Sequence, residues 1–384
     1  MTTTADGSVE APDTTDRRLK VLHVFKTYAP DTFGGIERVI HAIIRSGRAF
    51  GIEGEVFTVS PSPQPAEIEV DGARVFRARQ DAYVASTGLS YSAVRQFRDR
   101  IQHVDLIHYH FPWPFMDLLH LAYGRGRPAI ATYHSDIVRQ SALLSLYRPL
   151  MMRFLSSLDA IVATSPNYVE TSPVLRRFPV TTEIVPIGIE ADPGRIDTAL
   201  RAAFATRLPP RFFLFVGVLR YYKGVSFLIE AARQSGLPLV LVGDGEERSA
   251  IENADLPNLH MVGPVGDAEK AALLDLCCGF VFPSHLRSEA FGVALLEAAR
   301  AGRPMISCAI GTGTSYVNIH GETGITVPPA DPMALASAMK RLWHDGELAA
   351  QMGRAARERF ERLFRAEAMA KSYASIYRRV LKGG

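Results

Sequence analysis

The chain has 384 residues, of which 47% are hydrophobic and 22% are charged, and its formal net charge is +3 at pH 7. This composition is typical of a soluble globular protein with room for two domains of ordinary size. The small net charge disfavours a nucleic-acid partner, and no apolar run in the sequence is long enough to cross a bilayer.

The cysteines and the N-terminus indicate a reducing compartment. Cys277, Cys278 and Cys308 are few, odd in number and without the spacing of zinc ligands. We therefore expect free thiols in a cytoplasmic protein. Residues 1–19 lack the basic start and apolar core of a signal peptide, and their polar, acidic composition predicts a disordered leader.

In chain order, the first half alternates short apolar runs with amphipathic segments, which predicts a parallel sheet covered by helices. A first domain is expected over residues 20–190. Its strands are predicted at 21–25, 54–59, 73–77, 105–110, 128–134 and 159–165. A loop with Gly34 and Gly35 follows the first strand and precedes a helix, as in units that approach a phosphate, although two glycines alone usually mark a turn.

Polar side chains follow two of the later strands. His134 and Asp136 come directly after an apolar run, and Trp113 follows the strand at 105–110. Since ligands of such sheets bind at the carboxyl ends of the strands, we expect these residues near a cleft. A buried structural histidine is the commoner role for a residue like His134. The apolar, weakly basic segment 137–158 predicts either a packed helix or a membrane contact.

The second half restarts the alternating pattern. Strands are predicted at 212–217, 239–242, 258–265, 279–284 and 304–308, so we place a connection at 191–211 and a second domain at 212–365. Arg220 and Lys223 flank the turn after the first of these strands. Two cations at such a turn can neutralise a diphosphate leaving group without a metal ion.

The most informative stretch of the sequence is 288–302, which contains two glutamates on either side of a predicted helix start. Its two carboxylates, Glu289 and Glu297, are eight residues apart, or ~12 Å if helical throughout. Between them, the amides of Phe291, Gly292 and Val293 lie where a helix would begin, which is a ready site for an anion. A nucleotide sugar has hydroxyls at both ends and phosphate in the middle, and fits this pattern. Spacing alone is weak support, since most such glutamate pairs are unrelated surface charges.

This stretch resembles the Glu-x7-Glu motif of family 4 retaining glycosyltransferases, which have the GT-B fold. The resemblance begins at Lys20 and is strongest from Phe212 to Asp331. The turn at 217–224 is similar to the family's Gly-x-Leu-x-x-x-Lys-Gly pattern. One loop departs from the family: many members have Gly-Gly-x-x-Glu where this chain has 311–315, and the glutamate is missing.

The resemblance implies an α/β, GT-B architecture of two doubly wound, Rossmann-like domains facing across a cleft. The donor would bind the second domain and the acceptor the first, and the helix over 366–384 would cross back to the first domain. Implied catalytic residues are His134, Arg220, Lys223 and Glu289. Implied donor-binding residues are Gly34, Gly35, Arg220, Lys223, Glu289, Phe291, Gly292, Val293, Glu297 and Thr314. Implied acceptor-binding residues are Asp136 and Trp113.

The chain looks similar to bacterial mannosyl- and rhamnosyltransferases of surface polysaccharide synthesis. This implies transfer of a hexose, mannose first, from a GDP-sugar to a lipid-linked or oligosaccharide acceptor. No cofactor or metal is expected, and the location implied is the cytoplasm with peripheral contact at the inner membrane face. A UDP-hexose donor, a phosphorylase or epimerase of the same fold, and a non-catalytic nucleotide-sugar sensor are the alternatives. A dehydrogenase is disfavoured because no Gly-x-Gly-x-x-Gly follows the first strand.

Overall fold

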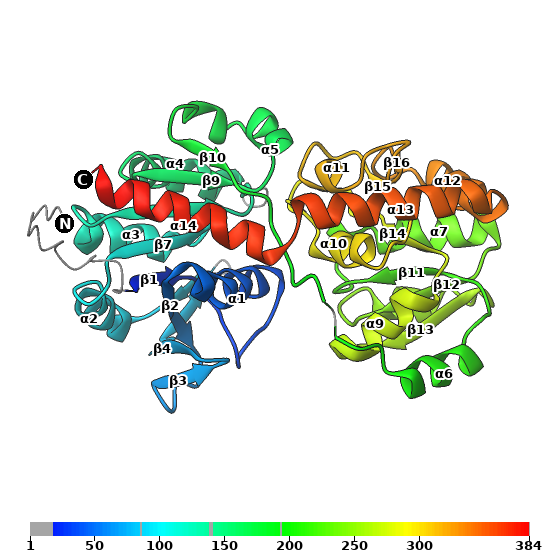
Figure 1. The fold of residues 1–384 in the computed structure, drawn as a ribbon, viewed down its shortest axis with the longest axis horizontal. Helices are drawn as coiled ribbons and strands as arrows, with labels where there is room; N and C mark the ends of the chain where they lie inside the picture. Colours follow the sequence, from blue (N-terminus) through cyan, green and yellow to red (C-terminus); the bar gives the residue numbers. More distant parts are fainter. Residues whose placement is uncertain (1–17, 85–86, 138–140, 193, 384) are drawn as a thin grey trace, which may run out of the picture.

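The computed structural model describes residues 18–84, 87–137, 141–192 and 194–383. Figure 1 shows two α/β domains side by side along the long axis of the molecule. Most of the predicted leader, residues 1–17, lies outside the described residues. The three cysteines are free thiols in the structure.

The first domain is built on an eight-stranded sheet in the order β10-β9-β8-β7-β1-β2-β4-β3. Its strands are parallel except for the edge strand β3. The strands are β1 (Leu19–Val24), β2 (Ile52–Ser60), β3 (Glu67–Val70), β4 (Ala73–Arg79), β7 (Leu106–Phe111), β8 (Ala129–Tyr133), β9 (Ala160–Ala163) and β10 (Thr182–Ile184); β5 (Ala82–Val84) and β6 (Thr87–Leu89) form a separate antiparallel pair. The helices are α1 (Gly35–Gly47), α2 (Tyr91–Arg100), α3 (Pro114–Leu119), α4 (Ser141–Leu155) and α5 (Pro166–Thr171).

The second domain is built on a six-stranded parallel sheet in the order β13-β12-β11-β14-β15-β16. Its strands are β11 (Phe213–Val216), β12 (Leu239–Val242), β13 (Leu259–Gly263), β14 (Gly279–Phe282), β15 (Met305–Cys308) and β16 (Gly324–Val327). The helices from here on are α6 (Thr198–Arg207), α7 (Val225–Ser235), α8 (Arg248–Glu252), α9 (Asp267–Leu276), α10 (Val293–Arg300), α11 (Thr314–Val317), α12 (Pro332–His344), α13 (Gly346–Leu363) and α14 (Ala366–Lys382).

Each sheet reverses its strand order at one point. In the first sheet, the chain moves outward from β1 on one side and from β7 on the other; in the second, it does so from β11 and β14. The loops after these neighbouring strands diverge and leave a crevice at the carboxyl ends, where ligands of open α/β sheets bind. The glycine loop follows β1, Lys223 follows β11, and Glu289 follows β14, so all three lie at switch points.

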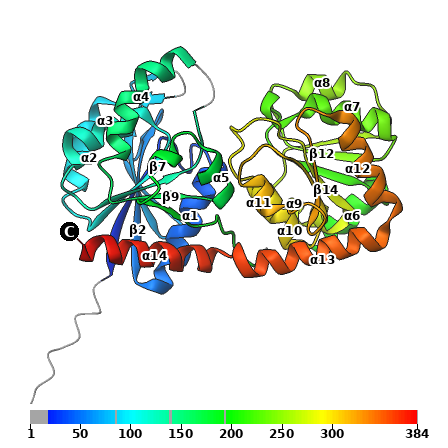
Figure 2. The same ribbon diagram turned by 90° about the horizontal axis from the view of Figure 1, so that it is seen from above.

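The last two helices join the domains. In Figure 2, α13 runs along the second domain and α14 continues along the first, where the chain ends. The crossing is held by Ile189, whose N–H donates to Phe364 O (2.9 Å) and whose carbonyl accepts from Ala366 N (2.9 Å). Tyr377 and Tyr373 of α14 then hydrogen bond to His108 and Thr132 in the first sheet.

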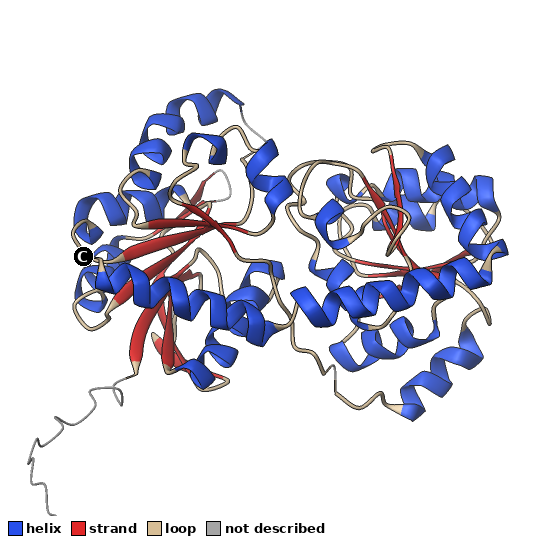
Figure 3. Cartoon of the chain, turned by 45° about the horizontal axis from the view of Figure 1, so that its top comes forward, coloured by secondary structure: helices blue, strands red, loops and turns tan. Residues whose placement is uncertain are grey.

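Helices cover both faces of each sheet (Figure 3), which explains why the central strands are continuous apolar runs and do not alternate with polar residues. All six residues of β7 are buried, including two histidines. The expected connection at 191–211 contains a full helix, α6, capped by Asp197, whose Oδ1 accepts from Ala199 N (2.8 Å). Alanine, leucine and arginine favour helix in this stretch, and it packs against α9 of the second domain.

Helix α4 occupies the segment whose role the sequence left open. Met151, Phe154 and Leu155 are buried against the first domain, whereas Leu146 is 81% exposed. Part of the segment, residues 138–140, lies outside the described residues. Within the described part of the chain, no helix combines the length and apolar character needed to cross a membrane.

Candidate active site

The loop after β14 pairs with the turn after β11. Lys223 Nζ forms an ion pair with Glu289 Oε2, and Ser284 Oγ donates to the same carboxylate oxygen (3.1 Å). Both charged side chains are only 13% exposed. The lysine ammonium also lies 5.0 Å from the centre of the Phe282 ring, where the face of the aromatic ring attracts a cation. The structure thus brings together two of the predicted catalytic residues from separate strands.

The second motif glutamate also has a lysine partner, which sequence reasoning missed. Lys270 Nζ of α9 donates to Glu297 Oε1 (2.6 Å) and to Asp267 Oδ1 (2.9 Å). Across the domain boundary, Arg38 of α1 forms an ion pair with Asp267 (3.2 Å). Burial would raise the pKa of Asp267, but Lys270 and Arg38 lower it to about 2. Lys270 belongs to no sequence motif, and only folding brings α9 beside α10.

The N-terminus of α10 lies between the two lysine–glutamate pairs. Gly292 precedes it with φ +86°, a conformation that favours glycine, and a Cβ there would come within 3.0 Å of the Phe282 ring. The backbone amides of Phe291 and Gly292 donate no hydrogen bond among the described residues. Open amides at a helix N-terminus suit a phosphate, and the contact of Phe291, Gly292 and Val293 with a donor phosphate stays a prediction.

The glycine loop of the first domain faces this helix. Glu37 Oε1 accepts hydrogen bonds from Thr27 Oγ1 (2.8 Å) and Thr32 Oγ1 (2.7 Å), which fixes the loop that contains Gly34 and Gly35. A Cβ on Gly35 would lie 4.0 Å from Val293 Cγ2 of α10. A cavity of about 360 Å³ opens between the domains beside this contact; its lining includes Phe33, Arg38, Lys270, Val293, Glu297 and Arg300.

The remaining donor candidates lie at the edges of this region. Arg220 is exposed at the start of the turn that carries Lys223. Burial lowers the pKa of Lys26, Glu37 opposes this shift, and the positive charge of Arg220 adds to it, so a first-domain lysine that the sequence did not indicate lies near Arg220. Thr314 is buried and its Oγ1 contacts Thr312 Oγ1 (3.2 Å), where it supports the motif loop.

The first-domain candidates differ in accessibility. His134 is 4% exposed, and its Nε2 hydrogen bonds to His110 Nδ1 (2.9 Å). Burial lowers the pKa of His134 to about 3, so the ring is neutral at physiological pH. Trp113 is fully buried, and its Nε1 donates to Gly88 O (3.2 Å). In this conformation Trp113 therefore has no exposed surface with which to contact an acceptor.

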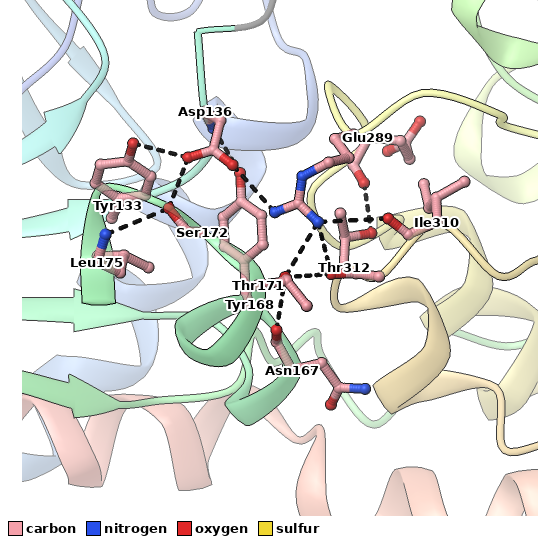
Figure 4. Close-up of polar contacts among 12 residues, drawn as sticks. Tyr133, Asp136, Asn167, Tyr168, Thr171, Ser172, Leu175, Glu289, Ile310 and Thr312 are labelled. Carbon is pink, nitrogen blue, oxygen red and sulfur yellow. Dashed lines mark hydrogen bonds and ion pairs between the residues drawn. The ribbon is translucent and has the colours of Figure 1, made fainter. Parts of the chain in front are cut away.

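Asp136 forms a bridge between the domains (Figure 4). Arg287 Nη2 lies 3.1 Å from Asp136 Oδ2, and Arg287 Nη1 donates to Gly311 O (2.9 Å). Tyr133 Oη and Ser172 Oγ donate to the other oxygen of Asp136 at 3.0 and 2.7 Å. Arg287 is a site residue that the sequence did not single out.

The bridge also locates His134 relative to the donor motif. Asp136 is two residues after His134, and Arg287 is two residues before Glu289. Two residues of chain span at most ~7 Å, so the Asp136–Arg287 ion pair keeps the backbone at His134 and the backbone at Glu289 close to the same contact between the domains. Ala290 confirms this proximity, since it packs against the buried cluster that contains Phe111 and Tyr133.

Three buried histidines lie close enough together to be considered as ligands of one metal ion. Ring nitrogens of His23, His108 and His110 all lie within 4.8 Å of one another. Both nitrogens of His108 are already hydrogen bonded, to Tyr377 Oη (2.8 Å) and Thr132 Oγ1 (2.7 Å). The expectation that the protein works without a metal stays a prediction.

Known proteins match nearly the whole chain. A family model described as Glycosyltransferase Family 4 matches residues 33–192, and one described as Glycosyl transferases group 1 matches residues 197–359. The D-rhamnosyltransferase WbpZ of Pseudomonas aeruginosa is 49% identical over 91% of this chain and 93% of its own length. The O-antigen chain mannosyltransferase C of Escherichia coli is 44% identical over 95% of this chain and 99% of its own length.

The fold is also found among solved structures. The sucrose-phosphate synthase of Thermosynechococcus elongatus superposes with a TM-score of 0.79 at 23% identity, covering 96% of this chain and all of that one. The two Rossmann-like domains and the two matching family models together define a glycosyltransferase of the GT-B class. The chain belongs to glycosyltransferase family 4, and the prediction of both fold and family is confirmed.

Proposed function

We propose that this glycosyltransferase moves mannose or D-rhamnose from a GDP-linked donor to a lipid-linked or oligosaccharide acceptor during the assembly of a bacterial surface polysaccharide. The names of the two similar relatives support a sugar of this type. D-Rhamnose is the 6-deoxy form of D-mannose, so the two candidate sugars differ only in the hydroxyl at C6. A UDP-hexose is the alternative donor.

The observation that carries this proposal is the pair of lysine–glutamate contacts on either side of the α10 N-terminus. In the proposed complex, Glu297 binds the ribose, the amides of Phe291 to Val293 meet the diphosphate, and Glu289 contacts the sugar. Lys223 can hold Glu289 and a phosphate oxygen at once because an ammonium group has three N–H donors. Arg220 adds a second positive charge on the phosphate side.

The proposed reaction retains the configuration at the anomeric carbon. The bond from C1 of the sugar to the diphosphate oxygen breaks, and the acceptor hydroxyl attacks C1 from the same face. The hydroxyl proton passes to an oxygen of the departing phosphate. Lys223, Arg220 and the α10 N-terminus stabilise the charge that develops there, which a positioned set of donors does best when it is fixed before the reaction. His134 lies on the opposite wall, near the sugar.

The proposed acceptor site and location follow from the first domain. The acceptor would enter from the side of Asp136, and α4 would contact the membrane through Leu146, which is 81% exposed. Two arginines of the same helix, Arg148 and Arg153, are exposed and would favour an anionic surface. We therefore propose a cytoplasmic enzyme that is loosely bound at the inner membrane face and is released by salt.

A donor panel tests the proposal directly. Purified protein is incubated with GDP-mannose, GDP-D-rhamnose, UDP-glucose and UDP-N-acetylglucosamine, and release of the nucleotide is measured with and without a lipid-linked acceptor. We expect turnover of one or both GDP-sugars, and an unchanged anomeric configuration in the product by proton NMR. Turnover of UDP-sugars alone would overturn the donor assignment. Failure of any nucleoside diphosphate to bind by calorimetry would favour a phosphorylase.

A further inference from the structure

Four histidines gather at the switch point of the first sheet, more than contact with one sugar requires. His23 lies on β1, His108 and His110 lie on β7, and His134 directly follows β8. All four are buried, between 0% and 4% exposed. Desolvation by burial is the main cause that lowers the pKa of each of them, so all four rings are neutral at physiological pH.

Three of these rings form a single file of hydrogen bonds. His23 Nδ1 lies 3.0 Å from His110 Nε2, and His110 Nδ1 lies 2.9 Å from His134 Nε2. The rings are nearly parallel along the file, with interplanar angles of 23° and 24°. His108 is outside it, because its two nitrogens bond to Thr132 and to Tyr377 of α14.

The file forces the three rings to share one tautomer. A neutral imidazole has one N–H donor and one acceptor nitrogen. If His23 donates from Nδ1, then His110 accepts at Nε2 and must itself donate from Nδ1, and His134 carries its proton on Nδ1 as well. In the opposite arrangement, all three rings carry the proton on Nε2. No mixed arrangement leaves both hydrogen bonds intact.

The inner end of the file selects between these two arrangements. His23 Nε2 is buried and has no hydrogen-bond partner among the described residues. Among buried backbone groups, N–H donors without a partner are rarer than carbonyl acceptors without one, and we apply the same preference to this ring nitrogen. The arrangement with protons on Nδ1 leaves only a bare acceptor at His23. It also gives His134 an Nδ1–H group at the outer end of the file, which can donate to a sugar oxygen at the proposed place of the sugar opposite His134.

We propose that His110 and His23 are positioning residues that lock His134 in its Nδ1–H tautomer and hold its ring against the donor sugar. The inference rests on the proposed place of the sugar opposite His134. The sheet topology supports the arrangement, since β1, β7 and β8 are adjacent and the registers pair His23 with His108 and His110 with Thr132. One face of three neighbouring strands therefore delivers the file to the carboxyl end of β8.

The first test needs no substrate. Full-length protein is labelled with ¹⁵N in its histidine rings, and long-range proton–nitrogen NMR spectra are recorded at pH 7.5, with His134→Ala, His110→Leu and His23→Asn used for assignment. We expect His23, His110 and His134 each to show one fixed tautomer with the proton on Nδ1. Protons on Nε2, or an averaged signal at His134, would overturn the proposal. So would stoichiometric binding of added zinc chloride by these rings, since the cluster would then be a metal site.

The second test measures catalysis. His110→Leu should lower kcat for sugar transfer by about ten- to a hundredfold, as expected when a functional side chain loses the partner that orients it. The dissociation constant for GDP should change less than twofold. His110→Asn keeps a hydrogen-bonding group where Nδ1 lies and should recover part of kcat. In a His134→Ala background, His110→Leu should have no further effect on kcat; an additive loss would contradict the proposal.

His120 provides a matched control. It is equally buried, 1% exposed, its pKa is lowered to about 4, and its ring bonds to Tyr109 Oη (3.0 Å) and Ser157 Oγ (3.0 Å) away from the file. His120→Leu should affect stability without affecting kcat, and an equal loss of kcat in both leucine variants would show a purely structural effect. If a leucine variant fails to fold, the wild-type spectrum and His110→Asn decide. If the wild type turns over no GDP-sugar, the proposed function fails while the tautomer result stands.

Discussion

The side chains on the two walls of the cleft differ in charge: those of the second domain form ion pairs, and the histidines of the first domain are neutral. At the switch point of the second domain, Lys223 with Glu289 and Lys270 with Glu297 provide compensated full charges. At the switch point of the first domain, His23, His110 and His134 provide neutral imidazoles in a buried hydrogen-bonded file. Because a diphosphate is highly charged and a sugar is not, the charged wall suits the leaving group and the neutral wall suits the transferred sugar.

The two walls also differ in the conditions under which they destabilise the folded protein. Buried ion pairs are stable only while both partners are present, since removing one leaves an uncompensated charge. Neutral histidines cost little at neutral pH but become costly when acid would protonate them. Substitution should therefore damage the second domain most, and acid should damage the first.

The largest effect is expected at Lys223. Lys223→Ala should lower kcat/KM by about a hundred- to a thousandfold, because it removes the proposed donor to the departing phosphate and leaves the Glu289 carboxylate, which is 13% exposed, without its cationic partner. It should weaken GDP binding as well, since in the proposed complex the lysine contacts phosphate before and during the reaction. Steady-state kinetics and calorimetry measure both. Arg233→Ala, which removes an exposed ion pair with Glu230, is the control and should leave both values unchanged. Wild-type kinetics in Lys223→Ala would exclude the phosphate role.

Substitutions of Glu297 and His134 should affect different quantities, nucleotide binding in the first case and turnover in the second. Glu297→Ala should weaken GDP binding about ten- to a hundredfold, since a hydrogen bond from ribose to a charged group contributes roughly 1.5–3 kcal/mol. His134→Ala should leave GDP affinity nearly intact and lower turnover of the intact donor. Titration of both variants with GDP and UDP, together with transfer rates, gives the comparison. If His134→Ala abolished GDP binding while Glu297→Ala bound GDP normally, the donor would bind the first domain. The assignment of the diphosphate to the second domain would then be wrong.

Acid should unfold the first domain before the second. The folded-state pKa values of His23 and His134, about 3, lie below the unfolded value of 6.5, so the unfolded chain binds more protons between these pH values. This contribution to the free energy of unfolding is therefore fully present above pH 6.5 and is lost as the pH is lowered. The loss is about 2 kcal/mol per histidine at pH 5.

The chain offers a separate reporter for each domain. Of its two tryptophans, Trp113 lies in the first domain and Trp343 in the second. Trp343→Phe and Trp113→Phe leave one emitting residue each, and urea titrations followed by fluorescence at pH 7.5 and pH 5 then report each domain. We expect the Trp113 midpoint to fall much more than the Trp343 midpoint. Equal shifts would show that acid sensitivity is not confined to the histidine file.

A smaller effect is expected where the two walls meet. Arg287→Ala breaks the ion pair with Asp136, two side chains that are 31% and 13% exposed. We expect a five- to thirtyfold loss in kcat/KM, equivalent to about 1–2 kcal/mol, because the first domain and the loop that carries Glu289 lose a contact that holds them together. A double-mutant cycle with Asp136→Asn checks the coupling. If the two losses simply add, Asp136 acts on the acceptor and not through Arg287.

Sequence reasoning placed the strands, loops and helices of the candidate site best where the site is local in the chain. Glu289 to Glu297 and the turn at Lys223 are short motifs whose strand, loop and helix can be recognised together. It missed Lys270, Arg287 and Lys26 because their partners are far away along the chain and only the folded domains bring them together. Likewise, His23 and His110 are ordinary members of apolar strands in the sequence, and only the strand order β8-β7-β1 reveals their file.

The smallest effect, none at all, is expected from removing divalent metals. The charges that a metal would supply to a diphosphate are present in Lys223, Arg220 and the α10 N-terminus, so transfer should continue at the same rate in EDTA. The measurement is the transfer rate after dialysis against EDTA, with and without added magnesium or manganese. Loss of activity that magnesium or manganese restores would mean that the charged wall is incomplete. Loss that only zinc restores would instead implicate the neutral wall, where the nitrogens of His23, His108 and His110 lie within 4.8 Å of one another.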